Sequence, residues 1–457
     1  MELASNDFNS KRLRTDGVCE LELERLKNRA RNEELMKEFD LLHHPQQLVS
    51  LQAFGSSCGY NLQRRTSLEQ RPAGPLVACD YLSGQDEAGE NSSDFSDRFL
   101  NEVLSVTGRR ASSVKPNHKD SSFDVLQVLG RVELREGVRF KITPSRLCSV
   151  AVHPFCVRKA VLAAGDKNGF VGLSLVDPNK SSGDEAEVVT YSPHCMSVYC
   201  LSFAEFAPNK LFSCSHDGSV RGLDIERKVF DQLYSADDYC KYFDFASPNT
   251  LVCALREQTV AVIDLRDYSS SSRSSCTYQL GKSRKNALRT VSVHPVETNR
   301  FAVAGTAGAV EVFDLRKLKT QGRSAQAVQT LQEPKSLSSA FFSPITGSRL
   351  VTCCSADTVS VYDMQPPTPT QLLQLKHNNH VGRWLTNFRP VWHPNSEDLI
   401  ISGSMLHPRV VEVMSVERAG VVQYLDGLSS VCSLNAAHPR IPLVCGVNSS
   451  GYAHVWC

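Results

Sequence analysis

The chain has 457 residues, of which 41% are hydrophobic, and its formal net charge is +1. This length allows one large β domain with extensions or two to three average domains. The near-neutral charge excludes a molecule-wide field for polyanions, so any nucleic-acid contact must be a local patch. No run of about 18 apolar residues occurs, and the polar N-terminus has no secretory apolar region, so we expect no membrane contact.

The 16 cysteines are scattered along the chain and do not form a metal-binding pattern. No CxxC pair and no Cys/His set with zinc spacing occurs. We therefore expect buried, reduced thiols, which are typical of a reducing compartment, and neither a metal ion nor a cofactor.

The first 45 residues divide into a polar tail and a charged helix. Residues 1–17 contain a basic cluster, Lys11, Arg12 and Arg14, which is either a weak nuclear-import signal or part of a solvated, disordered tail. Residues 18–45 have apolar side chains at roughly helical spacing and predict a helix. Such a helix is marginal in isolation, so we expect it to dock on its own domain or on a partner.

Residues 46–124 are rich in Ser, Gly and Gln and show little hydrophobic periodicity. This composition predicts a mostly disordered linker. One short helix is predicted within it, at residues 95–104.

From about residue 125 onward, a repeat is visible. Its marker is a small residue or histidine before proline at the end of a strand-like run, and the markers are 40 to 54 residues apart. Because X-Pro cannot continue a strand ladder, each marker indicates a turn between two strands of a four-stranded blade. The sequence therefore predicts an all-β, seven-bladed propeller over residues 125–457. The seven markers are His153-Pro154, Ala207-Pro208, Ser247-Pro248, His294-Pro295, Ser343-Pro344, His393-Pro394 and His438-Pro439.

The repeats resemble WD repeats in period and shape, although the Trp-Asp ending is reduced to pairs such as Ile263-Asp264 and Phe313-Asp314. The chain stops after only three strands of the seventh unit. We predict that residues 131–135, which alternate as a strand does, supply the fourth strand and close the ring.

No catalytic motif is present, so we do not expect an enzyme. Four histidines precede the proline in equivalent turns of different blades, and they cannot converge on one metal ion. We interpret them as turn residues that form local hydrogen bonds: His153, His294, His393 and His438.

Basic side chains gather where the chain crosses from one blade to the next. These crossings all open on one face of a propeller, around the central channel, so the pattern predicts a local phosphate-binding patch. Scattered, solvated surface charge is the alternative. The members of the predicted patch are Arg146, Arg284, Lys285, Arg289, Lys335, Lys376 and Arg383, with Lys167 on a hairpin of the same face.

The crossing before blade six, HNNHVGRWLTNFRP from residue 377 to 390, is longer than those before blades two and three. It contains His380 and then Gly382, Arg383 and Trp384, which we place at the tip of the loop. An exposed tryptophan beside arginine suits stacking on, or wedging between, bases. Folding of Trp384 back into the core is the alternative.

The segments FKITPSRL, GDKNGFVG, HNNHVGRWLTNFRPVWHP and GSMLHPRVVEV resemble the WD repeat-containing protein 76 family, as do residues 18–45. A more distant similarity is to damage-specific DNA-binding protein 2, which inserts a wedge into DNA at lesions. The wedge positions match Gly382, Arg383 and Trp384, but the aromatic residue is displaced, which leaves lesion insertion open. Arg146, Lys167 and Lys335 match basic positions of that relative.

The resemblance also gives a meaning to two Asp-x-Arg endings, Asp264-Leu265-Arg266 and Asp314-Leu315-Arg316. They are similar to the motif by which WD-repeat receptors dock onto the large damaged-DNA-binding adaptor of cullin-4 ubiquitin ligases. Support of their own turns is the alternative role for the two aspartates.

Two functions are consistent with these features. The first is a nuclear protein that binds double-stranded DNA in the damage response and serves as the substrate receptor of a cullin-4 ligase. The second is a non-catalytic scaffold whose basic face binds histone tails or other acidic or chromatin partners.

Overall fold

All described residues of the computed structural model belong to one compact unit, which begins after residue 66. The tail predicted at 1–17 and the helix predicted at 18–45 lie outside the described residues. No helix in the described part of the chain is long and apolar enough to cross a membrane. The structure describes residues 70–83, 93–107, 129, 134–156, 158–178, 186–266, 275–281, 286–318 and 325–457.

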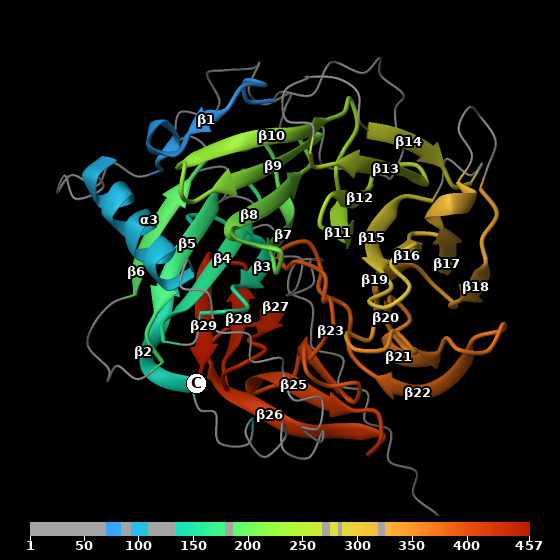
Figure 1. Ribbon diagram of the computed structural model, residues 1–457. Helices are drawn as coiled ribbons and strands as arrows, with labels where there is room; N and C mark the ends of the chain where they lie inside the picture. Colours follow the sequence, from blue (N-terminus) through green and yellow to red (C-terminus); the bar gives the residue numbers. More distant parts are fainter. Residues whose placement is uncertain are drawn as a thin grey trace, which may run out of the picture. The chain divides into compact units, whose positions relative to one another are not determined.

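Seven antiparallel sheets stand around a central axis as the blades of a propeller, which confirms the predicted fold class (Figure 1). Blade one contains β3 (Leu147–Val152), β4 (Ala160–Asp166), β5 (Val171–Val176) and β6 (Glu187–Tyr191). Blade two contains β7 (Val198–Ala204), β8 (Ala207–Ser215), β9 (Ser219–Asp224) and β10 (Val229–Ser235). Blade three contains β11 (Tyr242–Ser247), β12 (Thr250–Ala254), β13 (Thr259–Asp264) and β14 (Ser275–Gln279).

The chain continues around the ring in the same way. Blade four contains β15 (Leu288–Val293), β16 (Arg300–Gly305), β17 (Ala309–Asp314) and β18 (Gln329–Gln332), with the short helix η2 (Leu315–Lys317) after β17. Blade five contains β19 (Leu337–Phe342), β20 (Arg349–Cys354), β21 (Thr358–Asp363) and β22 (Thr370–Lys376). Blade six contains β23 (Val391–Trp392), β24 (Leu399–Gly403), β25 (Arg409–Ser415) and β26 (Gly420–Leu428).

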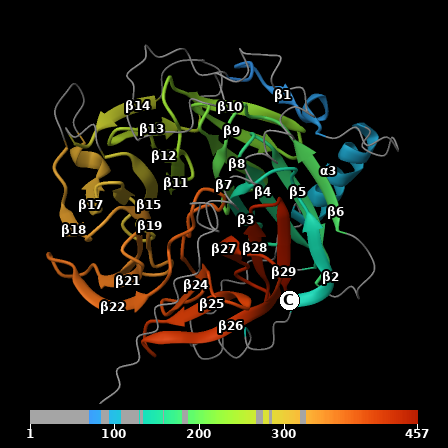
Figure 2. The same cartoon turned by 180° about the vertical axis from the view of Figure 1, so that it is seen from behind.

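Blade seven closes the ring. Its strands β27 (Cys432–Ala437), β28 (Val444–Asn448) and β29 (Tyr452–Trp456) come from the end of the chain, and β2 (Leu134–Lys141) pairs with β29 as the fourth strand. The predicted closure is confirmed for β2, whose described residues begin at Leu134, while residues 131–133 of the predicted strand lie outside the described residues. Figure 2 shows β2 beside β29, next to the C-terminus. Pairing with β2 leaves β29 without a free edge.

The core lies between the blades, because a blade cannot bury both of its faces alone. Between blades three and four, Val252 and Val260 pack with Val291 and Phe301, and all four side chains are buried. Five of the seven X-Pro markers lie between the first and second strands of their blades, as predicted, and in a sixth Ser247 ends β11 while Pro248 lies in the turn. The exception is Ala207-Pro208, which begins β8 just after the turn.

Part of the expected linker is ordered and packs on the propeller. Strand β1 (Leu76–Val77) adds a fifth strand to blade two by pairing with β10, and the short helix η1 (Ala78–Tyr81) follows it. Helix α3 (Ser93–Thr107), predicted at 95–104, buries Phe99, Leu100 and Val103 against this part of the ring. Residues 70–83 and 93–107 are therefore ordered parts of the segment predicted as a mostly disordered linker over 46–124, because they supply apolar side chains that the propeller covers.

Candidate nucleic-acid interface

In a blade of antiparallel strands, the crossing to the next blade and the hairpin between the second and third strands lie at the same end. We call this end the crossing face. The turns after the first and third strands lie at the other end, the turn face. Residues 377–390, which we call the strap, form the crossing between β22 and β23.

The strap is fixed where it leaves blade five. The backbone N–H of Asn379 donates to Asp357 Oδ1 (2.9 Å), and its side-chain amide donates to the carbonyl oxygens of Cys354 (2.8 Å) and Thr358 (3.1 Å). A second bond joins His377 Nε2 and the carbonyl oxygen of Gly403 in blade six (2.9 Å). These bonds hold the first turn of the strap against two blades.

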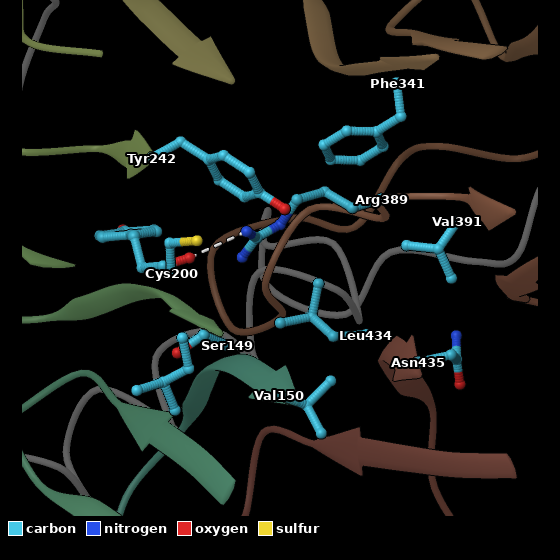
Figure 3. Close-up of a pocket in the computed structure, with 11 residues that line it drawn as sticks. Ser149, Val150, Cys200, Tyr242, Phe341, Arg389, Val391, Leu434 and Asn435 are labelled. Atoms are coloured by element: carbon cyan, nitrogen blue, oxygen red, sulfur yellow. Dashed lines mark hydrogen bonds between the residues drawn. The ribbon is translucent and has the colours of Figure 1, made fainter. Parts of the chain in front are cut away.

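The strap is also fixed on the far side of the channel. Thr386 Oγ1 donates to the carbonyl of Leu147 in blade one (2.6 Å). The Arg389 guanidinium donates to the carbonyl of Tyr199 in blade two (2.9 Å) and to that of Cys148 in blade one. Figure 3 shows the Arg389 side chain in the middle of the ring of first strands. The strap therefore crosses the channel and joins blades five and six to blades one and two.

Between these anchors, three residues project outward. Gly382 has φ +63°, a left-handed conformation that favours glycine, and no atom lies within 4 Å of the position a Cβ would occupy. Arg383 and Trp384 are exposed, and the exposed fraction of Trp384 is 83%. On either side, Val381 and Leu385 pack against a buried apolar cluster. The structure thus places Trp384 in solvent rather than in the core.

Two other predicted residues adjoin this tip. Arg146 Nη1 donates to the carbonyl oxygen of Arg383 (2.8 Å), so its guanidinium supports the strap backbone. Lys167 is exposed on the hairpin between β4 and β5, and its backbone N–H donates to the carbonyl of Arg146 (2.9 Å). Lys167, Arg146, Arg383 and Trp384 therefore form one continuous surface.

The remaining predicted residues lie on the crossing face without a described contact to that tip. Lys376 ends β22 and is exposed, as is His380, whose backbone N–H donates to Asn378 Oδ1 (3.0 Å). Lys335 is exposed before β19. Arg289 is half-buried and donates to the carbonyl of Leu337 (3.1 Å). Arg284 and Lys285 lie outside the described residues.

Two further cations of this face were not among the predicted residues. Lys241 directly precedes the first strand of blade three, as Arg146 precedes that of blade one, so the rule that identified Arg146 also applies to Lys241. Arg389 stands two residues before the first strand of blade six, at the end of the crossing that was predicted to carry basic side chains.

The Asp-x-Arg pairs end the third strands of blades three and four, on the turn face. Arg316 Nε and Nη2 donate to the two carboxylate oxygens of Asp314 (3.0 and 2.7 Å). Arg266 Nε and Nη2 donate to those of Asp264 in the same way (2.9 and 2.5 Å). These bonds lower the pKa of each aspartate to about 2. Each arginine side chain keeps an exposed fraction of 69%. Both aspartates also accept a backbone N–H of their own turn, so turn support and display of the arginine occur together.

Among the described residues, no cluster of His, Cys, Asp and Glu side chains could hold a metal ion. The four histidines before proline accept or share local hydrogen bonds, as predicted. For example, His438 Nδ1 accepts the backbone N–H of Arg440 (2.9 Å) and His294 Nδ1 accepts that of Glu297 (2.9 Å).

Comparison with known proteins gives relatives but no matching family model. A Xenopus laevis protein named WD repeat-containing protein 76 is 37% identical over 369 residues, which cover 79% of this chain and 61% of the relative. The Mus musculus protein of the same name is 38% identical over 334 residues, or 72% of this chain and 52% of the relative. The chain thus spans less than two thirds of the length of these relatives.

More distant relatives have a name that states an activity. The DNA damage-binding protein CMR1 of Chaetomium globosum is 25% identical over 357 residues, or 70% of this chain and 66% of the relative. A second protein of that name, from Phaeosphaeria nodorum, is 24% identical over 349 residues, or 69% of this chain and 66% of the relative.

Proposed function

Because the chain is a WD-repeat propeller homologous to the proteins named WD repeat-containing protein 76, we propose that it binds double-stranded DNA through the crossing face in the nuclear response to DNA damage. The tip of the strap makes the contact, and the protein performs no catalysis of its own. The name of the fungal relatives, DNA damage-binding protein, supports this role.

The exposure of Trp384 carries the proposal. A solvent-exposed indole on a backbone that is anchored on both sides gains nothing for folding, since burial of aromatic surface stabilises a fold. The same indole can stack on a base or wedge between bases, and the neighbouring Arg383 can neutralise a phosphate. Lys167 extends the positive charge away from the tip.

The test is DNA affinity measured against salt concentration, with damaged and undamaged duplexes. We expect Arg383→Ala/Trp384→Ala to weaken binding by roughly 10- to 100-fold, because it removes one stacking contact and one charge. The slope of log affinity against log salt should fall by about 1. Tyr424→Ala, which removes an exposed aromatic ring from outer strand β26, serves as the matched control. Unchanged affinity in the double variant would contradict the role of the tip.

The alternative is a scaffold whose basic face binds histone tails or other chromatin partners. The same double variant separates the two functions. If it retains duplex affinity but loses binding to nucleosomes or acidic peptides, the scaffold function is favoured.

We further propose that the turn face docks the large damaged-DNA-binding adaptor of cullin-4 ligases, so that the protein acts as a substrate receptor. The supporting observation is that Arg266 and Arg316 stand in the same exposed, bidentately held geometry on neighbouring blades. An arginine held in this way presents its remaining N–H donors with little loss of side-chain entropy.

We expect Arg316→Ala to abolish recovery of the adaptor in a pull-down, while DNA affinity is retained. Lys317→Ala, which removes the adjacent positive charge in η2, is the control. Undiminished recovery with Arg316→Ala would refute the assignment.

A further inference from the structure

Lys241 occupies an unusual position at the mouth of the central channel. Its Nζ lies 3.4 Å from the centroid of the Tyr199 ring and 2.8 Å from His216 Nε2. The Tyr199 and His216 rings are themselves in contact, with centroids 4.2 Å apart. Lys241 and Tyr199 are only half-buried, so the group is reachable from solvent.

Three arginines approach the same point from other parts of the ring. Arg389 donates to the carbonyl of Tyr199, and burial raises the pKa of the Tyr199 hydroxyl, while the charges of Arg146, Arg389 and Arg289 oppose that rise. Four cations therefore surround one tyrosine, three from crossings (Arg146, Lys241 and Arg389) and Arg289 from strand β15.

Within the described residues, the hydrogen bonds from Lys241, Arg389 and Arg146 go to an imidazole and to backbone carbonyls, and none goes to a carboxylate. Clustered like charges repel one another, and the repulsion grows as water is excluded. A bound anion would offset it. The cavity beneath, lined by Tyr199 and Arg389, measures about 40 Å³, which suffices for water but not for a nucleotide. An anion must therefore lie at the mouth, on the crossing face.

We propose that the channel mouth, at Lys241 and at Arg389 of the strap, binds one phosphate group of the nucleic-acid backbone. This inference rests on the proposed function and adds a second contact to that made by Arg383 and Trp384. Lysine and arginine are the side chains that form charge-assisted hydrogen bonds to phosphate.

Binding at this mouth is coupled to a proton. Burial, together with the charges of Arg389 and Arg289, lowers the pKa of Lys241 to about 7. A phosphate favours the charged amine and raises this pKa, so the complex takes up a proton when it forms near or above pH 7. DNA affinity should then fall as the pH rises through 7 and beyond.

Among the described residues around Lys241, His216, Tyr199, Cys148 and Cys214 keep one charge state in that range. Burial, followed by the charge of Lys241, lowers the pKa of His216 to about 3, and burial raises the pKa values of Tyr199 and Cys148 and that of Cys214. The groups that face Lys241 are His216 from the hairpin after β8, Tyr199 from β7, Cys148 from β3, Cys214 from β8, Arg289 from β15 and Arg389 from the strap.

The experiment is calorimetric titration of the whole chain with duplex DNA at pH 7.5, in buffers with different enthalpies of ionisation. For the wild type, we expect the observed enthalpy to depend on the buffer and to report proton uptake. Lys241→Gln should remove this dependence and weaken binding by roughly tenfold. Lys317→Gln, in η2 on the turn face, is the matched control and should behave as the wild type.

Lys241→Arg separates the phosphate contact from a structural role. Arginine keeps its charge at all of these pH values, so this variant should bind DNA with near wild-type affinity but without proton uptake. DNA binding without proton uptake in the wild type, or unchanged proton uptake in Lys241→Gln, would overturn the inference and leave the proposed function intact.

The source of the phosphate is tested with a duplex whose backbone is partly replaced by neutral methylphosphonates. We expect proton uptake to decrease with this duplex. If inorganic phosphate causes the uptake and duplex DNA does not, the backbone is not the ligand and the inference fails. Absence of any duplex binding by the wild type would instead contradict the proposed function itself.

Discussion

The histidines before proline are side chains that could bind a metal ion or transfer a proton, yet in this fold they stabilise turns through hydrogen bonds. His393 is buried, its Nδ1 accepts the backbone N–H of Asn395 (3.3 Å), and burial lowers its pKa to about 4. His438 in the next blade has the same arrangement and a pKa of about 4. A neutral imidazole is therefore part of the folded turn, and protonation is a cost that only the folded state bears.

This cost predicts a dependence of stability on pH. The folded-state pKa of His393 lies below its ordinary value of 6.5, so the unfolded chain binds the proton first as the pH falls. The free energy of unfolding should decrease between about pH 6.5 and pH 4. In His393→Asn, which keeps an acceptor for the turn, this acid-induced loss should be smaller by about 2 kcal/mol.

Denaturant unfolding at pH 7 and pH 4.5 measures the effect. His380→Asn, at an exposed histidine of the strap, is the control and should show the same loss as the wild type. An equal loss in both variants would mean that the His393 turn is not sensitive to acid.

At the scale of elements, helix α3 and strand β1 show that the segment before the propeller is partly built into it. The apolar face of α3 is covered by blades one and two, and the hydroxyl groups of Ser96 and Tyr191 share a hydrogen bond (2.9 Å). Ion pairs at the surface, such as Lys228 with Asp97 (3.1 Å), contribute little because they are solvated. Apolar burial is therefore what holds the helix.

We predict that Phe99→Ala detaches α3 from the ring. Phe99 has an exposed fraction of 1%, and truncation of a buried phenylalanine costs about 3–5 kcal/mol. Hydrogen exchange should accelerate in residues 93–107 and remain slow in β8 and β9, because the blade keeps its own ladder. Arg98→Ala, on the exposed side of the helix, should leave exchange unchanged. Loss of protection throughout blade two would show that the helix is essential for that blade.

At the scale of the whole molecule, the crossing face and the turn face of the propeller are separated by the length of a strand. The strap, Lys241 and the basic side chains lie on the crossing face, whereas Arg266 and Arg316 lie on the turn face. Two large partners could thus bind without competing for surface, and this separation is why the DNA and adaptor variants are expected to act independently.

The sequence by itself determined the architecture. The X-Pro markers, the strand-like alternation and the unfinished seventh unit predicted seven blades and the closing strand, and the structure shows both. The markers and the alternation are local, since each turn and hairpin forms between strands that are neighbours in the chain. The closing strand is not local, because β2 pairs with β29 from the far end of the chain, and it was predicted from the missing fourth strand of the seventh unit. The outward position of Trp384 also had a local cause, because Gly382 permits the left-handed turn at the tip.

Only the tertiary structure decided which side chains meet at the centre. Arg389 donates to the carbonyl of Tyr199, 190 residues away in the chain. Ser96 shares a hydrogen bond with Tyr191, although composition assigned the segment of Ser96 to a linker. Ring closure brings the first strands of all blades to one axis. The spacing of residues in the chain does not predict which side chains next to those strands come into contact at the axis. For that reason the sequence predicted a basic face that includes Arg146, whereas only the fold shows that Arg146 also holds the strap and that Lys241 and Arg389 lie together at the channel mouth.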